Sequence, residues 1–135
     1  MSARGFAMTE ALVALAIFGV ALTGSLGLAL EGFATTLEAR RAQQAAGLAA
    51  DLAGRIATLP GVDWHALPAA TPCEPACSPA QSAGLELAQW RQLLGDTLPA
   101  GAATLAPGAA GSLLLRLEWC ETGGAVRGFE LEVVP

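Results

Sequence analysis

Three cysteines and a single histidine are the most reactive side chains of this sequence. Cys73 and Cys77 lie close together, Cys120 lies far downstream, and His65 precedes all three. Three thiolates and one imidazole are a ligand set that zinc uses in structural sites. In an exported chain, however, neighbouring cysteines more often form a disulfide. We therefore expect a disulfide and no bound metal, with His65 packing in its loop beside Trp64.

The sequence leaves the pairing of the cysteines open. A bond between Cys73 and Cys77 would close a tight loop, whereas a bond from either of them to Cys120 would attach that loop to the C-terminal part of the chain. We favour Cys73–Cys77, because strand alternation places Cys120 and its neighbour Trp119 on opposite faces. One cysteine stays unpaired in every arrangement.

The other polar residues do not form a recognisable catalytic set. No serine or cysteine stands in a nucleophile motif, and no glycine-rich phosphate-binding loop occurs. The chain carries 12 acidic residues against 7 basic ones, for a net charge of −5. Such a charge disfavours nucleic acid and anionic lipid head groups as partners. We expect no enzymatic activity, no cofactor and no nucleic-acid partner.

One acid stands in an unusual place, directly before a long apolar segment. Glu10 precedes residues 11–30, which carry no charge. A helix of that length spans the hydrocarbon core of a bilayer, which is about 30 Å thick. Because a carboxylate costs about 2.5 to 3.5 kcal/mol at the bilayer centre, a cationic partner is expected for Glu10. Arg4 before the segment and Glu31 after it predict a cytoplasmic N-terminus and an exported remainder.

The helical pattern continues beyond the apolar segment. Apolar residues recur at helical spacing and predict one buried stripe, formed by Phe33, Leu37, Ala45, Leu48, Leu52, Ile56 and Leu59. Glu38 with Arg41, and Asp51 with Arg55, are spaced as charge pairs on the helix surface. Pro60-Gly61 ends the pattern. We therefore predict one helix with an apolar half, residues 6–30, and an amphipathic half, residues 31–59.

Four glycines lie in or just after the apolar half, at Gly19, Gly24, Gly27 and Gly32, and Gly24 and Gly27 are the candidate soft spot. Each glycine weakens a helix by up to about 1 kcal/mol relative to alanine. Small residues also allow helices to approach one another closely. A soft spot that can unwind and a simple packing role are both consistent with these positions.

The remaining residues, 60–135, predict a small head of the α+β class. A proline-rich loop over 60–77 precedes a helix over 79–95, which has Ser78 as its N-cap and Gln81 as its capping-box partner.

Alternating residues predict an antiparallel hairpin over 113–134, with Arg116 opposite a glutamate of the second strand. Between the helix and the hairpin, only a short strand around Thr104-Leu105 is expected. The sheet then has two or three strands.

The N-terminal motif has a known counterpart. Gly5-Phe6, followed by Glu10 and the apolar segment, resembles the class III signal of type IV pilins and type II secretion pseudopilins. This resemblance implies that a prepilin peptidase removes residues 1–5 by cutting between Gly5 and Phe6, and methylates the new N-terminal Phe6. It also implies that Glu10 meets the N-terminal amine of a neighbouring subunit during assembly.

Further segments narrow the resemblance. RRAQQAAGLAADLAGRI, CSPAQSAGLELAQWRQLL and LRLEW are similar to the minor pilins called type IV pilus modification protein PilV. The implied role is priming of pilus assembly, with other minor pilins, the major pilin and the inner-membrane assembly platform as partners. The implied location is the inner membrane with a periplasmic head, and later the pilus surface. The sequence differs from the family pattern in two places. Gly27 stands where major pilins commonly have proline, and Ala7-Met8 is less hydrophobic than the pair that usually follows the phenylalanine.

Two other roles are compatible with the same sequence. A minor pseudopilin of a type II secretion system would share the signal and the long helix. A single-pass periplasmic protein that never polymerises would explain the helix, but not the combination of Gly5, Phe6 and Glu10.

Overall fold

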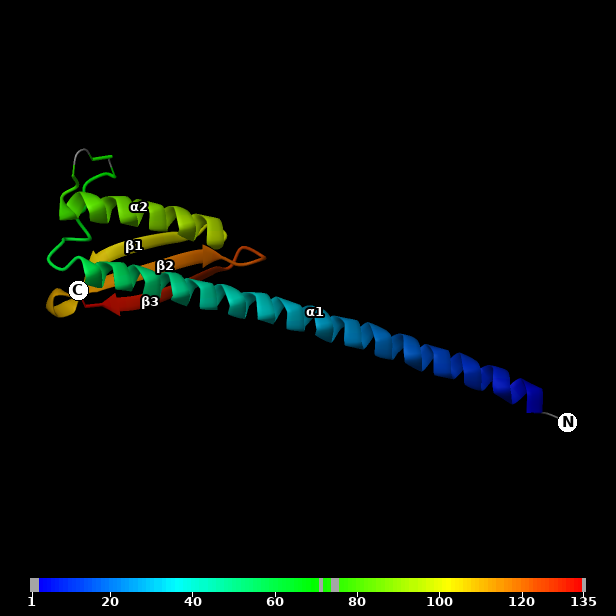
Figure 1. Ribbon diagram of the computed structural model, residues 1–135. Coiled ribbons are helices and arrows are strands. Elements are labelled where there is room, and N and C mark those ends of the chain that lie inside the picture. The colour runs from blue at the N-terminus through cyan, green and yellow to red at the C-terminus, as the bar shows by residue number, and fades with distance from the viewer. Residues whose placement is uncertain (1–2, 71, 74–75, 135) are drawn as a thin grey trace. The chain divides into compact units, whose positions relative to one another are not determined.

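The computed structural model describes residues 3–70, 72–73 and 76–134, with residues 3–7 described as backbone only. Its elements in order are α1 (Ala3–Thr58), α2 (Pro79–Thr97), β1 (Ala102–Pro107), a short 3-10 turn (Ala109–Gly111), β2 (Leu113–Cys120) and β3 (Val126–Val133). A long N-terminal helix, a second helix and a three-stranded antiparallel sheet (Figure 1) confirm the predicted α+β class. The chain divides into two compact units, residues 1–39 and 40–135.

The N-terminal unit consists of the first part of α1. This helix begins at Ala3, slightly before the predicted start at Phe6. Hydroxyl groups inside its apolar sequence are satisfied locally, because Ser25 Oγ donates to the carbonyl of Ala21 at 2.9 Å and Thr23 Oγ1 donates to that of Val20 at 2.9 Å. Side chains that bond back to the preceding turn in this way can lie in a nonpolar environment without an unpaired hydroxyl.

The last part of α1 belongs to the C-terminal unit and supplies much of its core. The buried residues lie on one face of the helix: Ala45, Leu48, Ala49, Leu52 and Ile56. The predicted stripe is wrong for its first members, since Phe33 and Leu37 are 69% and 49% exposed. Helical periodicity reports that an apolar face exists, but not whether another part of the same chain covers it.

The local signals around the end of α1 are confirmed. Arg55 Nε and Asp51 Oδ2 form the predicted pair at 2.9 Å. The helix ends at Thr58, and Gly61 follows with φ of +80°, a left-handed conformation that suits glycine after a helix.

Helix α2 begins with the predicted cap. Ser78 Oγ accepts a hydrogen bond from the Gln81 backbone N–H, and the Gln81 side chain accepts one from the Ser78 N–H. The helix continues to Thr97, two residues beyond the predicted end, because Leu94 and Leu98 are both buried and tertiary packing outweighs the cost of Gly95. Trp90 Nε1 donates to the carbonyl of Leu48 at 3.0 Å and so connects α2 with α1.

The sheet has the strand order β1-β2-β3, with both pairs antiparallel. Strand β1 is a complete strand of six residues, so the prediction of only a short strand around Thr104-Leu105 was too cautious. Three alanines and a proline give this six-residue segment little strand signal of its own. Pairing with the strongly patterned β2, as in Leu105 opposite Leu115, makes it a strand.

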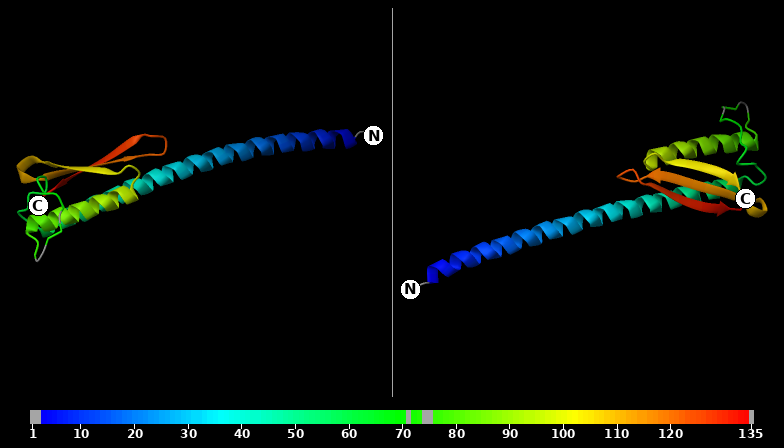
Figure 2. Two further views of the ribbon diagram at one scale, coloured as in Figure 1. Left: turned by 90° about the horizontal axis from the view of Figure 1, so that it is seen from above. Right: turned by 180° about the vertical axis from the view of Figure 1, so that it is seen from behind.

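The predicted hairpin is confirmed in its register. Leu113, Leu115, Leu117 and Trp119 of β2 are buried, and Arg116 stands opposite Glu130 with Nη1 and Oε1 3.6 Å apart. Arg116 Nε also lies 2.9 Å from Glu118 Oε1. Within the C-terminal unit, α2 and the last part of α1 cover the same face of the sheet (Figure 2). The other face carries these charged side chains.

Candidate functional site

The candidate assembly motif lies at the start of α1. Gly5 and Phe6 are helical, and the Glu10 side chain is exposed one turn further on. Among the described side chains, those of residues 8–70, 72–73 and 76–134, none forms an ion pair with Glu10. Met1 and Ser2 of the expected leader lie outside the described residues, and cleavage between Gly5 and Phe6 stays a prediction.

The segment after Glu10 is apolar and uncovered. Its large hydrophobic side chains are exposed: Leu12, Val13, Leu15, Ile17, Phe18, Val20, Leu22, Leu26, Leu28 and Leu30. The exposed fraction reaches 73% at Val20 and Leu28, far more than a soluble helix tolerates on every face. By length and composition, α1 is the one helix of the described chain that could cross a membrane.

The two glycines of interest lie in uninterrupted helix. At both Gly24 and Gly27, a Cβ atom would meet no other atom within 4 Å. No described neighbour in this chain therefore requires a glycine at either position. Local unwinding and close packing of helices, the two alternatives that the sequence left open, both stay predictions.

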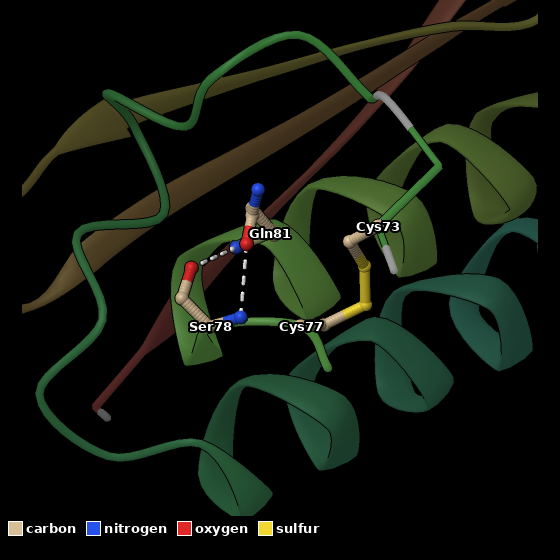
Figure 3. Close-up of a disulfide and its surroundings, with 4 residues drawn as sticks. All are labelled: Cys73, Cys77, Ser78 and Gln81. Atoms are coloured by element: carbon tan, nitrogen blue, oxygen red, sulfur yellow. Dashed lines mark hydrogen bonds between the residues drawn. A yellow bond between two sulfur atoms is a disulfide. The ribbon is translucent and has the colours of Figure 1, made fainter. Parts of the chain in front are cut away.

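The cysteines adopt the pairing that we favoured. Cys73 and Cys77 form a disulfide with Cα atoms 5.3 Å apart, and Cys120 is a partly buried free cysteine on β2. Figure 3 shows that the disulfide lies directly before Ser78, the residue that caps α2. The Ser78 cap satisfies the first turn of α2, and the disulfide fixes Cys77 directly before that cap.

His65 is not part of a metal site in the described chain. Its Nδ1 lies 2.5 Å from Asp63 Oδ1, and Cys73 and Cys77 are engaged in their disulfide. Among the described residues, no three histidine, cysteine or acidic side chains come together in a way that could hold a metal ion.

A buried carboxylate at the end of β2 is the feature that sequence reasoning missed. Glu121, which lies within the predicted hairpin and was given no role, has a side chain that is 4% exposed. Trp119 Nε1 donates to its Oε1 at 2.7 Å, and Arg41 Nη1 donates to its Oε2. Arg41 also donates to Thr122 Oγ1 at 3.3 Å, so that this cluster attaches α1 to the β2–β3 turn.

The surroundings of Glu121 favour its charged form. The hydrogen bond from Trp119, and then the hydrogen bond and positive charge of Arg41, lower the pKa of the Glu121 carboxyl, while burial opposes them in part. Arg127 lowers the pKa further through its charge. No sequence signal could have found this cluster, because Arg41 and Glu121 are 80 positions apart and meet only in the folded unit.

The lowered pKa predicts a pH dependence of stability. Because the folded state holds the charged form more tightly than the unfolded state, Glu121 stabilises the fold fully above its unfolded pKa of about 4.3 and loses this contribution as the pH falls below it. Thermal unfolding of the full chain in detergent, followed by near-UV circular dichroism, should show Glu121→Gln least stable relative to wild type at neutral pH. The difference should shrink toward pH 3.

Glu130→Gln is the matched control, since the Glu130 side chain is 56% exposed and its loss should change stability little at any pH. A stability difference for Glu121→Gln that stays constant across the pH range would contradict the proposed electrostatic role of Glu121.

We also compared the chain with known proteins. No family model, no curated protein and no solved structure matches this chain.

Proposed function

We propose that this chain is a minor pilin that takes part in type IV pilus assembly. The observation that carries the proposal is the motif Gly5-Phe6 with Glu10 at the start of α1, followed by an apolar segment that is exposed on all sides. A helix of this kind is unstable in water, and it needs either lipid or similar helices around it. A pilin uses both environments in turn.

The proposed mechanism is structural rather than catalytic. After a prepilin peptidase removes residues 1–5 and methylates Phe6, the subunit waits in the inner membrane with its C-terminal unit in the periplasm. The assembly platform then transfers the apolar segment from lipid into the filament core. There, the helices of other minor pilins and of the major pilin replace the lipid contacts.

Glu10 would guide this transfer. In the low dielectric of a filament core, a carboxylate and the N-terminal amine of a neighbouring subunit attract strongly, and each offsets the cost of removing the other from water. Apolar contacts alone would not distinguish one axial position from another, whereas the ion pair forms at one position only.

Intact mass spectrometry of the protein coexpressed with a prepilin peptidase tests the proposal. We expect the wild-type chain to lose residues 1–5 and to gain one methyl group. Gly5→Val should stay uncut, because the resemblance assigns the cleavage to the glycine, and Gly19→Ala should be processed normally because its site is open space. A wild-type chain that stays uncut would favour a single-pass protein that does not polymerise.

A minor pseudopilin of a type II secretion system is the second candidate, since it would show the same processing. Deletion of the gene separates the two machines. Loss of twitching with normal protein secretion supports the pilus, and the opposite result supports the secretion system.

A further inference from the structure

Strand β3 has no neighbour on one of its two sides among the described strands. The strand order β1-β2-β3 places β2 in the middle of the sheet and β3 at its border (Figure 1). Backbone N–H and C=O groups along such an edge can pair with a strand of another molecule. Gly128 of β3 is exposed, and because glycine has no side chain, this exposure belongs to the backbone. The edge of β3 is therefore open to solvent at Gly128.

The register of the hairpin shows which residues of β3 turn their backbone groups to this open edge. Cys120 stands opposite Val126, yet its N–H donates at 2.9 Å to the carbonyl of Pro99, just before β1. The next N–H, that of Glu121, donates at 2.7 Å to the carbonyl of Ala125, just before β3. Opposite residues alternate between hydrogen-bonded and non-hydrogen-bonded pairs along an antiparallel ladder. Every second residue of β3 therefore turns its N–H and C=O away from β2: Val126, Gly128, Glu130 and Glu132.

The side chains of these same residues make the open edge acidic. They lie on the outer face of the sheet, where Arg116 of β2 is 2.9 Å from Glu118 and 3.6 Å from Glu130. Glu132 adds a third carboxylate, so the outer face of β2 and β3 carries three acids and one base. Like charges directly opposite each other destabilise a strand pair, whereas opposite charges stabilise it. The edge therefore favours a strand with basic side chains over a second copy of β3.

The other face of β3 is apolar. Phe129 and Leu131 pack against the core, but they are only partly buried at this last described strand. A further strand with apolar residues on this face would cover more of both side chains. The opposite edge of the sheet lacks this combination, because β1 has no charged residue and ends at Pro107, which has no N–H to donate.

From these observations we propose that β3 binds an antiparallel strand of another protein, in which basic residues alternate with apolar ones. Backbone groups of the incoming strand pair with those of Gly128 and Glu130. Its lysine or arginine side chains lie beside Glu130 and Glu132, and its apolar side chains extend the layer formed by Phe129 and Leu131. This pairing does not depend on the role of the chain in a pilus.

Nuclear magnetic resonance of the ¹⁵N-labelled full chain in a non-ionic detergent tests the proposal. The probe is a short acetylated and amidated peptide in which lysine alternates with valine. We expect the amide signals of Gly128 and Glu130 to shift and to saturate with a dissociation constant on the order of 0.1 mM. Hydrogen exchange of both amides should become slower at saturation. The amides of Ala103 and Leu105 in β1 should stay unchanged.

Two control peptides separate strand pairing from attraction between charges alone. In an antiparallel pair, the lysine opposite Glu130 exchanges backbone hydrogen bonds with it. The same peptide with N-methyl groups on its lysine amides keeps the charges but lacks these donors, so it should give no saturable shift. A peptide with glutamate in place of lysine should bind at least about tenfold more weakly.

Three variants locate the binding on β3, and their thermal unfolding midpoints check that each keeps its fold. Gly128→Pro removes a donor from the open edge, a change that edge strands tolerate, and should abolish the saturable shift at Glu130. Glu130→Lys should weaken binding of the lysine peptide by about fivefold and strengthen binding of the glutamate peptide. Asp96→Lys makes the same change of charge at an exposed position of α2 and should bind as wild type does.

Several results would overturn the proposal. These are the absence of a saturable shift at Gly128 and Glu130, equal binding of the N-methylated peptide, and equal binding of the glutamate peptide. Slow exchange of the same two amides without peptide, increasing with protein concentration, would assign the edge to a second copy of the chain and would also overturn it.

Discussion

Replacing Glu10 with alanine should leave cleavage and methylation of the chain intact, yet reduce its amount in assembled pili by about tenfold or more. In the proposed filament, the Glu10 carboxylate neutralises the N-terminal amine of a neighbouring subunit. Removing one partner of a desolvated ion pair leaves the other charge buried without compensation, at a cost of about 3–5 kcal/mol. The measurement is quantitative immunoblotting of sheared pili against the membrane fraction, with intact mass as the record of processing.

Two further variants make this result specific to the charge of Glu10. Glu10→Gln keeps the size of the side chain and should fail as alanine does. Glu31→Ala removes an exposed acid at the other end of the apolar segment and should be incorporated normally. Normal incorporation of both Glu10 variants would rule out the ion pair as the guide for assembly, while leaving the membrane helix itself unaffected.

Replacing Trp90 with alanine should cause the largest loss of stability of any single change in the C-terminal unit. Trp90 is 1% exposed at the contact of α2 with α1, and its removal leaves a cavity the size of an indole. Substitutions of this kind cost about 3–5 kcal/mol. Loss of the hydrogen bond to the Leu48 carbonyl adds about 1 kcal/mol. Urea unfolding of the full chain in detergent, followed by near-UV circular dichroism, measures the effect.

Trp90→Phe separates the two contributions. Phenylalanine retains most of the apolar contact and lacks the donor, so we expect a loss of about 1–2 kcal/mol. Gln92→Ala, at an exposed position of the same helix, should stay within about 0.5 kcal/mol of wild type. If Trp90→Ala were as stable as Gln92→Ala, the packing of α2 on α1 would not hold the unit together.

The elements with strong local signals were predictable from the sequence. The capping box at Ser78 and Gln81, the surface pair of Asp51 with Arg55, and the register of Arg116 with Glu130 all appear as expected. Each depends on residues that are near in sequence or on the fixed alternation of a hairpin. The favoured disulfide between Cys73 and Cys77 belongs to the same group, since its partners are close in the chain.

Features that depend on distant partners were not predictable. Strand β1 exists as a full strand because β2 pairs with it, and the apolar stripe of α1 is buried from Ala45 rather than from Phe33. In both places the local sequence gives only a preference, for a strand or for an apolar helix face. Whether that preference leads to strand pairing or to burial depends on a part of the chain that is distant in sequence.

The sequence by itself is the basis of the proposed assembly motif, since the spacing of Gly5, Phe6 and Glu10 before an uncharged helix needs no tertiary context. Only the tertiary structure decided the surroundings of two polar groups, the Glu121 carboxylate and the Trp64 indole N–H. Glu121 became a buried charge because folding brings Arg41 and Trp119 to it. Trp64 was left with an unpaired donor because its loop and α2 enclose it without an acceptor among the described residues. Hydrogen bonding and desolvation depend on groups that come together only in the folded chain. Whether a polar group is buried and paired therefore cannot be inferred from the residues next to it in the sequence.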